Sequence, residues 1–124
     1  MTANNRVSRV ICRLGLAALL LSLALSLAAH EAELSSTPED GARLQDAPPR
    51  IGIEFDGAMR ITLFEVTGPG GAVALADEPG SEPTQEYFVT PAQPLEPGDY
   101  EVRWRGLARD GHMMRGDFRF TVEE

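Results

Sequence analysis

The sequence predicts an all-β fold, a two-sheet sandwich of about seven strands. Short runs rich in β-branched and aromatic residues alternate with clusters of glycine, proline and acidic residues, a spacing typical of sandwich folds. Two of the runs alternate strictly between apolar and polar residues, as a half-buried strand requires. After residue 29 we expect no long helix, no internal repeat and no second domain.

The expected strands are short and follow one another closely along the chain. They are Ala32–Ser36, Ile51–Phe55, Met59–Thr67, Ala72–Leu75, Thr84–Thr90, Asp99–Leu107 and Arg115–Val122. In the last two runs, alternate residues are apolar and are expected to face the core: Tyr100, Val102, Trp104, Phe118, Phe120 and Val122. Trp104 is therefore expected in the core, and Tyr100, just after Pro97-Gly98, is expected to make a contact like that of a tyrosine corner.

The first 29 residues have the pattern of a secretory signal peptide. Residues 1–13 contain three arginines and no acidic residue, and the apolar stretch Leu14–Leu27 follows. This stretch is shorter than the ~20 apolar residues that a spanning helix needs, so removal is expected rather than anchoring. Cleavage before Ala29 satisfies the preference for small residues through Ser26 and Ala28, whereas cleavage before His30 places Leu27 where a small residue is preferred. The domain expected after removal is residues 30–124, with no membrane span.

The charge composition of residues 30–124 argues against two classes of binding partner. Three of the 11 basic residues lie in residues 1–29 and all 19 acids lie after them, so residues 30–124 carry 8 basic against 19 acidic residues, a net charge of −11. Such a domain would be repelled by nucleic acid and by anionic membranes. The one cysteine, Cys12, lies within the predicted signal peptide. No disulfide is therefore expected in the domain.

The chain contains only two histidines, His30 and His112. Cleavage after Ala29 makes His30 the first residue, whose free amine and imidazole can chelate one metal ion together. His112 follows Asp110-Gly111, so a third nitrogen and a carboxylate oxygen stand two residues apart, with a glycine that lets the backbone bend. Together, His30 and the Asp110–His112 segment therefore predict a metal site.

These residues stand within a longer pattern that resembles the periplasmic copper-resistance CopC family. The pattern spans nearly all of residues 30–124. It comprises His30, Ser35-Ser36-Thr37-Pro38-Glu39-Asp40-Gly41, Ala47-Pro48, Phe55, Pro94-Leu95-x-Pro97-Gly98-x-Tyr100-x-Val102-x-Trp104 and Asp110-Gly111-His112-x-x-x-Gly116-x-Phe118-x-Phe120-x-Val122.

The resemblance implies a small Ig-like or cupredoxin-like Greek-key β-sandwich or barrel. It implies a periplasmic protein that binds one Cu(II) per chain through the amine and imidazole of His30, Asp110 and His112. The implied role is copper resistance, either by sequestering copper or by passing it to an inner-membrane transporter of the CopD type, without catalysis. Asp110 serves as a ligand, or else orients His112 as an outer hydrogen-bond partner.

The chain departs from the family pattern near the expected site. Many members carry Phe-Ser-Glu-Pro where this chain has Phe55-Asp56-Gly57, so an auxiliary carboxylate has been lost unless Asp56 replaces it. Met113 and Met114 follow His112, and thioether sulfur favours Cu(I). In a strand, however, one side chain of an adjacent pair points into the core.

Two other functions fit the same residues. One is an Ig-like interaction module that binds no metal, since sandwich folds serve many functions. The other is a small copper oxidase, because an N-terminal His with a second His resembles the histidine brace of polysaccharide monooxygenases. Against an oxidase, the domain is small and has only two tyrosines, so no extended aromatic binding face is evident.

Overall fold

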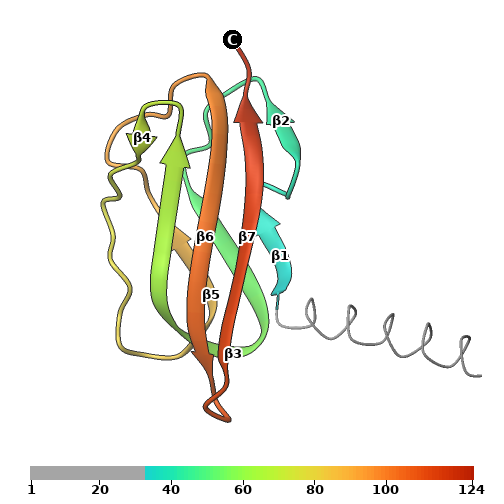
Figure 1. The fold of residues 1–124 in the computed structure, drawn as a ribbon, viewed down its shortest axis with the longest axis vertical. Coiled ribbons are helices and arrows are strands. Elements are labelled where there is room, and N and C mark those ends of the chain that lie inside the picture. The colour runs from blue at the N-terminus through green and yellow to red at the C-terminus, as the bar shows by residue number, and fades with distance from the viewer. Residues whose placement is uncertain (1–32) are drawn as a thin grey trace, which may run out of the picture. The chain divides into compact units, whose positions relative to one another are not determined.

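The computed structural model describes residues 33–124, which form seven β-strands. The predicted signal peptide and His30 lie outside the described residues. No helix long and apolar enough to cross a bilayer occurs within residues 33–124. The strands are β1 (Glu33–Thr37), β2 (Ala42–Leu44), β3 (Ile51–Gly68), β4 (Gly71–Ala72), β5 (Thr84–Val89), β6 (Gly98–Ala108) and β7 (Met113–Val122) (Figure 1).

Strand β3 is long enough to belong to both layers of the sandwich. Its first part pairs with β1 and β5, and its second part pairs with β4 and β6. Between them the pairing with β5 is irregular from Glu54 to Met59, where β3 curls (Figure 1). The sequence there is Asp56-Gly57-Ala58, and a glycine in a strand commonly marks a bend or bulge. The curl folds one continuous strand back over the core.

The strand order along the sheet is β1-β3-β6-β7-β2, with β4 and β5 also paired to β3. All the strand pairs are antiparallel except β2 with β7. The all-β sandwich predicted from the sequence is therefore confirmed.

The core lies between the two layers and matches the alternation in the sequence. Each side chain predicted to face inward from β6 and β7 is at most 4% exposed: Tyr100, Val102, Trp104, Phe118, Phe120 and Val122. The ring of Phe55, from the first part of β3, meets Trp104 edge-on with centroids 5.0 Å apart, which joins the two layers. The Tyr100 hydroxyl donates to the Glu96 carbonyl at 2.6 Å, confirming the predicted corner contact.

Several strand boundaries differ from the predicted ones. The runs Ile51–Phe55 and Met59–Thr67 are one strand, because the curl at Gly57 bends the chain without ending it. The run Ala72–Leu75 is reduced to β4 and an isolated bridge between Leu75 and Pro91. Strand β2 was not predicted, because its three residues are too few to show a periodicity. It forms through parallel pairing with β7, which is distant in the sequence.

Candidate functional site

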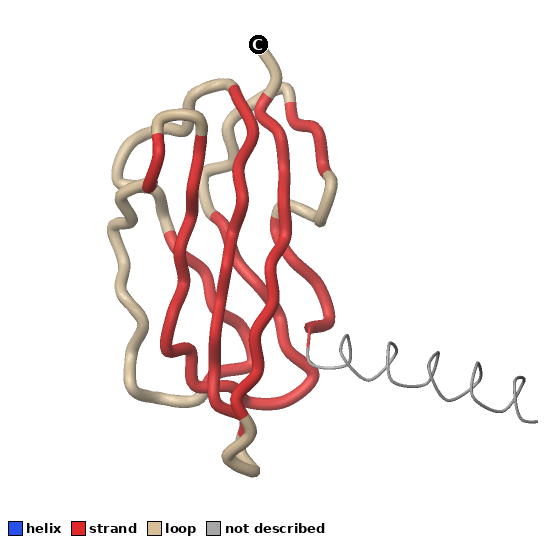
Figure 2. Tube along the Cα trace, viewed as in Figure 1, coloured by secondary structure: helices blue, strands red, loops and turns tan. Residues whose placement is uncertain are grey.

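The turn between β6 and β7 carries the predicted Asp110-Gly111-His112 segment. The Gly111 N–H donates to the Ala108 carbonyl at 3.0 Å, and the Ala108 N–H donates to the His112 carbonyl at 2.9 Å. Gly111 has φ of 86°, in the left-handed region that favours glycine. A tight turn followed by a glycine in this conformation is a common three-residue hairpin loop. Figure 2 shows this hairpin end as the tan loop at the lower tip of the fold.

Asp110 holds His112 at two points. One carboxylate oxygen, Oδ1, accepts the backbone N–H of His112 at 3.0 Å, and Oδ2 lies 2.7 Å from the ring Nδ1. The backbone N–H of His112, followed by its ring, holds the pKa of the Asp110 carboxyl below its usual value. Asp110 therefore stays ionised, and a neutral His112 ring that donates from Nδ1 presents the lone pair of Nε2.

Both side chains are open to solvent. The His112 side chain is 80% exposed and the Asp110 side chain is 63% exposed. Within residues 33–124, no group of three or more His, Cys, Asp or Glu side chains is placed to hold a metal ion. The structure thus brings Asp110 and His112 together, while the third predicted ligand, His30, lies outside the described residues.

The two methionines after His112 point in different directions. Met113 is 59% exposed, whereas Met114 is half-buried and packs against the hydrophobic core. The expectation that one of the pair faces the core is confirmed. Asp56, the possible substitute carboxylate, is exposed within the curl of β3.

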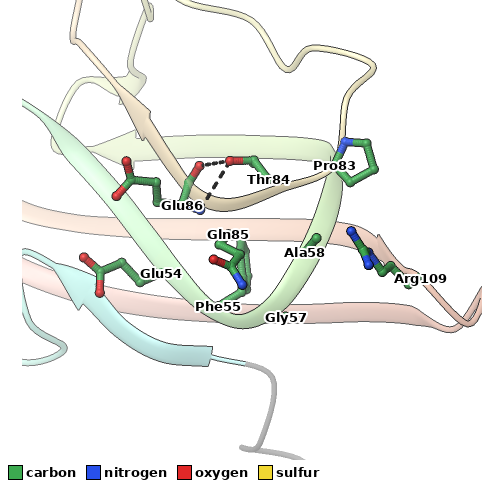
Figure 3. A pocket seen from close by; sticks show the side chains of 9 residues that line it. All are labelled: Glu54, Phe55, Gly57, Ala58, Pro83, Thr84, Gln85, Glu86 and Arg109. Atoms are coloured by element: carbon green, nitrogen blue, oxygen red, sulfur yellow. Dashed lines mark hydrogen bonds between the residues drawn. The ribbon is translucent and has the colours of Figure 1, made fainter.

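A depression of about 880 Å³ adjoins the curl of β3, and sequence analysis did not predict it. Arg109, from the β6–β7 turn, lies at one end of it, and Glu54 and Glu86 lie at the other (Figure 3). These two glutamates are directly opposite each other on β3 and β5. Only strand register could have revealed this pair, because 32 positions of sequence separate its members.

The comparisons with known proteins agree on one family. The chain is 29% identical to copper resistance protein C of Escherichia coli over 116 residues, covering 85% of this chain and 90% of that protein. It is 34% identical to copper resistance protein C of Pseudomonas syringae pv. tomato over 106 residues, covering 77% and 82%. The crystal structure of PcoC, a methionine-rich copper resistance protein from Escherichia coli, superposes with a TM-score of 0.61 at 29% identity, covering 76% of this chain and 99% of that chain.

The match also extends to the family level. Residues 34–123, which include every strand after the first residue of β1, match the CopC domain model. The sandwich, the corner contact of Tyr100 and the Asp110–His112 turn all fall within the matched range. The chain belongs to the CopC domain family.

Proposed function

We propose that this chain is a periplasmic Cu(II)-binding protein of copper resistance that binds one copper ion per chain and catalyses no reaction. It sequesters copper or passes it to an inner-membrane transporter of the CopD type. The observation that carries the proposal is the solvent-exposed pair of Asp110 and His112, in which the carboxylate Oδ2 and the ring Nδ1 lie 2.7 Å apart. The family match and the copper-resistance names of the relatives support it.

The proposed ligands are the amine and imidazole of His30, the imidazole of His112 and a carboxylate oxygen of Asp110. Chelation by His30 costs little additional entropy once its first bond to copper has formed. Nitrogen-rich tetragonal sets bind Cu(II) most tightly among the divalent first-row metals. The ionised state of Asp110 suits this set, because an anionic oxygen lowers the charge of the bound ion.

The register of the strands supports a role for His30. Glu33 pairs with Phe55, and four residues later β3 reaches Met59, the partner of Ala108 at the start of the β6–β7 turn. The described chain therefore begins near the end of the fold that carries Asp110 and His112. His30 stands three positions before Glu33, a reach of up to about 10 Å for an extended chain.

Asp110 has two possible roles in such a site, and the ring nitrogen that binds copper separates them. Binding through Nε2 leaves the hydrogen bond from Nδ1 to Asp110 in place, so that Asp110 orients the ring and increases its basicity. Binding through Nδ1 displaces that hydrogen bond and frees Oδ2 to become a ligand. The short distance from Oδ2 to Nδ1 supports the orienting role in the metal-free protein.

The test is a titration of the secreted, processed protein with Cu(II) against a strong chelator, after its N-terminus has been determined by mass spectrometry. We expect one copper per chain. His112→Ala and an extra residue before His30 should each weaken binding sharply, whereas Arg109→Gln, in the same turn, should not. Full retention by both altered proteins would show the ligand set to be wrong.

The same preparation separates the other functions. A protein that begins at Ala29 and retains no copper would be an interaction module. Copper-dependent peroxide formation in the presence of a reductant would indicate an oxidase.

A further inference from the structure

The outer face of β3, β6 and β7 near the turn carries a group of side chains that the copper site does not use. The register places Arg105 between Leu63 and Arg115, and the next row places Leu107 between Arg60 and Met113. These strands lie side by side in one layer (Figure 1). We call this group the arginine face; its members are Arg60, Leu63, Arg105, Leu107, Met113 and Arg115.

The arginines of this face lack acidic partners. Arg105 and Arg115 are directly opposite each other, and like charges in that position destabilise a sheet. Within residues 33–124, none of Arg60, Arg105 and Arg115 makes an ion pair. The three exposed positive charges therefore have no direct ion-pair partner within residues 33–124, in a domain whose overall charge is strongly negative.

Farther along the same outer face, the charges are arranged differently. Arg119 pairs with Glu101 at 2.8 Å, and Arg103 lies 3.9 Å from the same glutamate. Glu65 and Asp117 are the register partners of Arg103 on either side. Acids and arginines alternate there, whereas the two rows nearest the turn contain arginines and apolar residues only.

The apolar members complete a surface with the composition of a binding site. Met113 is the one large hydrophobic side chain that is exposed within residues 33–124, and Leu63 and Leu107 are half-buried. Arginine and methionine are enriched in protein interfaces, and guanidinium groups bind carboxylates through paired hydrogen bonds. A depression of about 620 Å³ adjoins these residues; its charged lining comprises Arg103, Arg105 and Arg115 together with Glu65, Glu101 and Asp117.

We propose that the arginine face docks an acidic segment of a partner protein. Carboxylates of the segment pair with Arg60, Arg105 and Arg115, and an apolar side chain covers Leu107 and Met113. Charge complementarity favours this occupant, because none of the three arginines forms an ion pair within residues 33–124. A narrow peptide segment contacts only this face. An extended anionic membrane would also approach the acidic residues around the face and be repelled by them.

A second copy of the chain is a poorer occupant. It can offer Glu54 and Glu86, which oppose each other on β3 and β5, but a contact between two different faces repeats into open chains. The high net negative charge of each copy also opposes such stacking.

Met113 directly follows His112, so a docked segment lies beside the turn. A role for that segment in copper exchange rests on the function proposed above, whereas the docking itself does not.

The test uses the processed, copper-free protein and a short fluorescein-labelled peptide rich in glutamate with two leucines. Fluorescence anisotropy at low salt should show binding. The double variant Arg105→Gln/Arg115→Gln should weaken it at least about tenfold, or about 1.4 kcal/mol. The control Arg43→Gln/Arg50→Gln makes the same change in net charge away from this face. It should weaken peptide binding less than about twofold, because neither arginine contacts the peptide and the exposed ion pair of Arg43 with Glu123 contributes little to stability.

Additional measurements make the outcomes distinct. Met113→Gln should also weaken peptide binding, and circular dichroism should show every variant folded. The proposal is wrong if the unaltered protein does not bind the peptide, or if the two double variants lose equal affinity. A second copy is the occupant instead if the unaltered protein self-associates in sedimentation and Arg105→Gln/Arg115→Gln abolishes this. A membrane is the occupant instead if that variant loses binding to phosphatidylglycerol vesicles while its peptide binding persists. Either result shows the proposal to be wrong. Cu(II) titration of that variant should be normal, so the copper site and the docking face can fail independently.

Discussion

The carboxylate of Asp110 engages both the backbone and the ring of His112, with Oδ1 3.0 Å from the backbone nitrogen and Oδ2 2.7 Å from Nδ1. One side chain thus stabilises the turn and sets which ring nitrogen is available. An exposed histidine ordinarily samples several ring orientations. The ring of His112 is restrained by Asp110, which would reduce the entropy lost on the copper binding proposed above.

Asp110→Asn should weaken Cu(II) binding by about 10- to 100-fold, the usual effect of removing the carboxylate partner of a ligating histidine. The amide can still accept the backbone N–H of His112, so the turn should persist. Chelator competition measures the affinity. Asp117→Asn, which removes the same charge from the exposed face of β7, is the control and should bind copper normally. Equal affinities of the two variants would contradict a role for Asp110.

Gly111→Ala should lower the free energy of unfolding by about 1 kcal/mol, because φ of 86° is unfavourable for a residue with a β-carbon. The added methyl meets no atom within 4 Å, so the effect is conformational rather than steric. Copper affinity should fall with it, since the turn positions Asp110 and His112. Gly111→Asn is the control, because asparagine tolerates this conformation. Urea unfolding measures the change in stability. An equal loss of stability in Gly111→Ala and Gly111→Asn would contradict the explanation from the backbone conformation.

Tyr100→Phe and Tyr87→Phe should have different effects on stability. The Tyr100 hydroxyl donates to the Glu96 carbonyl, so its loss should cost about 1 kcal/mol. The Tyr87 hydroxyl is buried and has no hydrogen-bond partner within residues 33–124, so its removal should be neutral or stabilising. Urea unfolding of both variants at neutral pH measures the difference. A larger loss for Tyr87→Phe would contradict the hydrogen-bond assignment.

Stability should fall at alkaline pH. Burial, together with the nearby charge of Glu96, raises the pKa of Tyr100, and burial also raises that of Tyr87. A raised pKa in the folded state means that the contribution is complete below the unfolded value of about 10 and is lost as pH rises beyond it. The double variant Tyr87→Phe/Tyr100→Phe should lose less stability than the unaltered protein between about pH 9 and about pH 11. Parallel pH dependences would refute this linkage.

Gly116→Ala should destabilise the fold by about 1–3 kcal/mol, the usual cost of overpacking a core. Gly116 is opposite Trp104, and a β-carbon there would lie 2.7 Å from the indole Nε1. Trp104 is 2% exposed and is held edge-on by Phe55, so it cannot move away freely. Gly57→Ala, with open space around the new methyl, should be neutral or slightly stabilising. Thermal unfolding, followed by the fluorescence of the single tryptophan, compares the two.

Local features of the sequence predicted much of the fold. Period-two alternation correctly assigned the inward side chains of β6 and β7, because the pleat alone decides which face a residue takes. The turn at Gly111 and the corner at Tyr100 were also predictable, since each depends on a few adjacent residues. The copper ligands stay a prediction, because His30 lies outside the described residues.

What the sequence determined by itself is therefore the position of most strand segments, the inward faces of β6 and β7 and the residues of the Asp110–His112 turn. Only the tertiary structure decided that β3 is one strand spanning two layers, that β2 pairs with β7, and that Arg60, Arg105 and Arg115 gather on one face. The physical reason is register. Alternation is a local property of the backbone, whereas the pairing of distant strands is set by packing of the whole core, and no single segment encodes it.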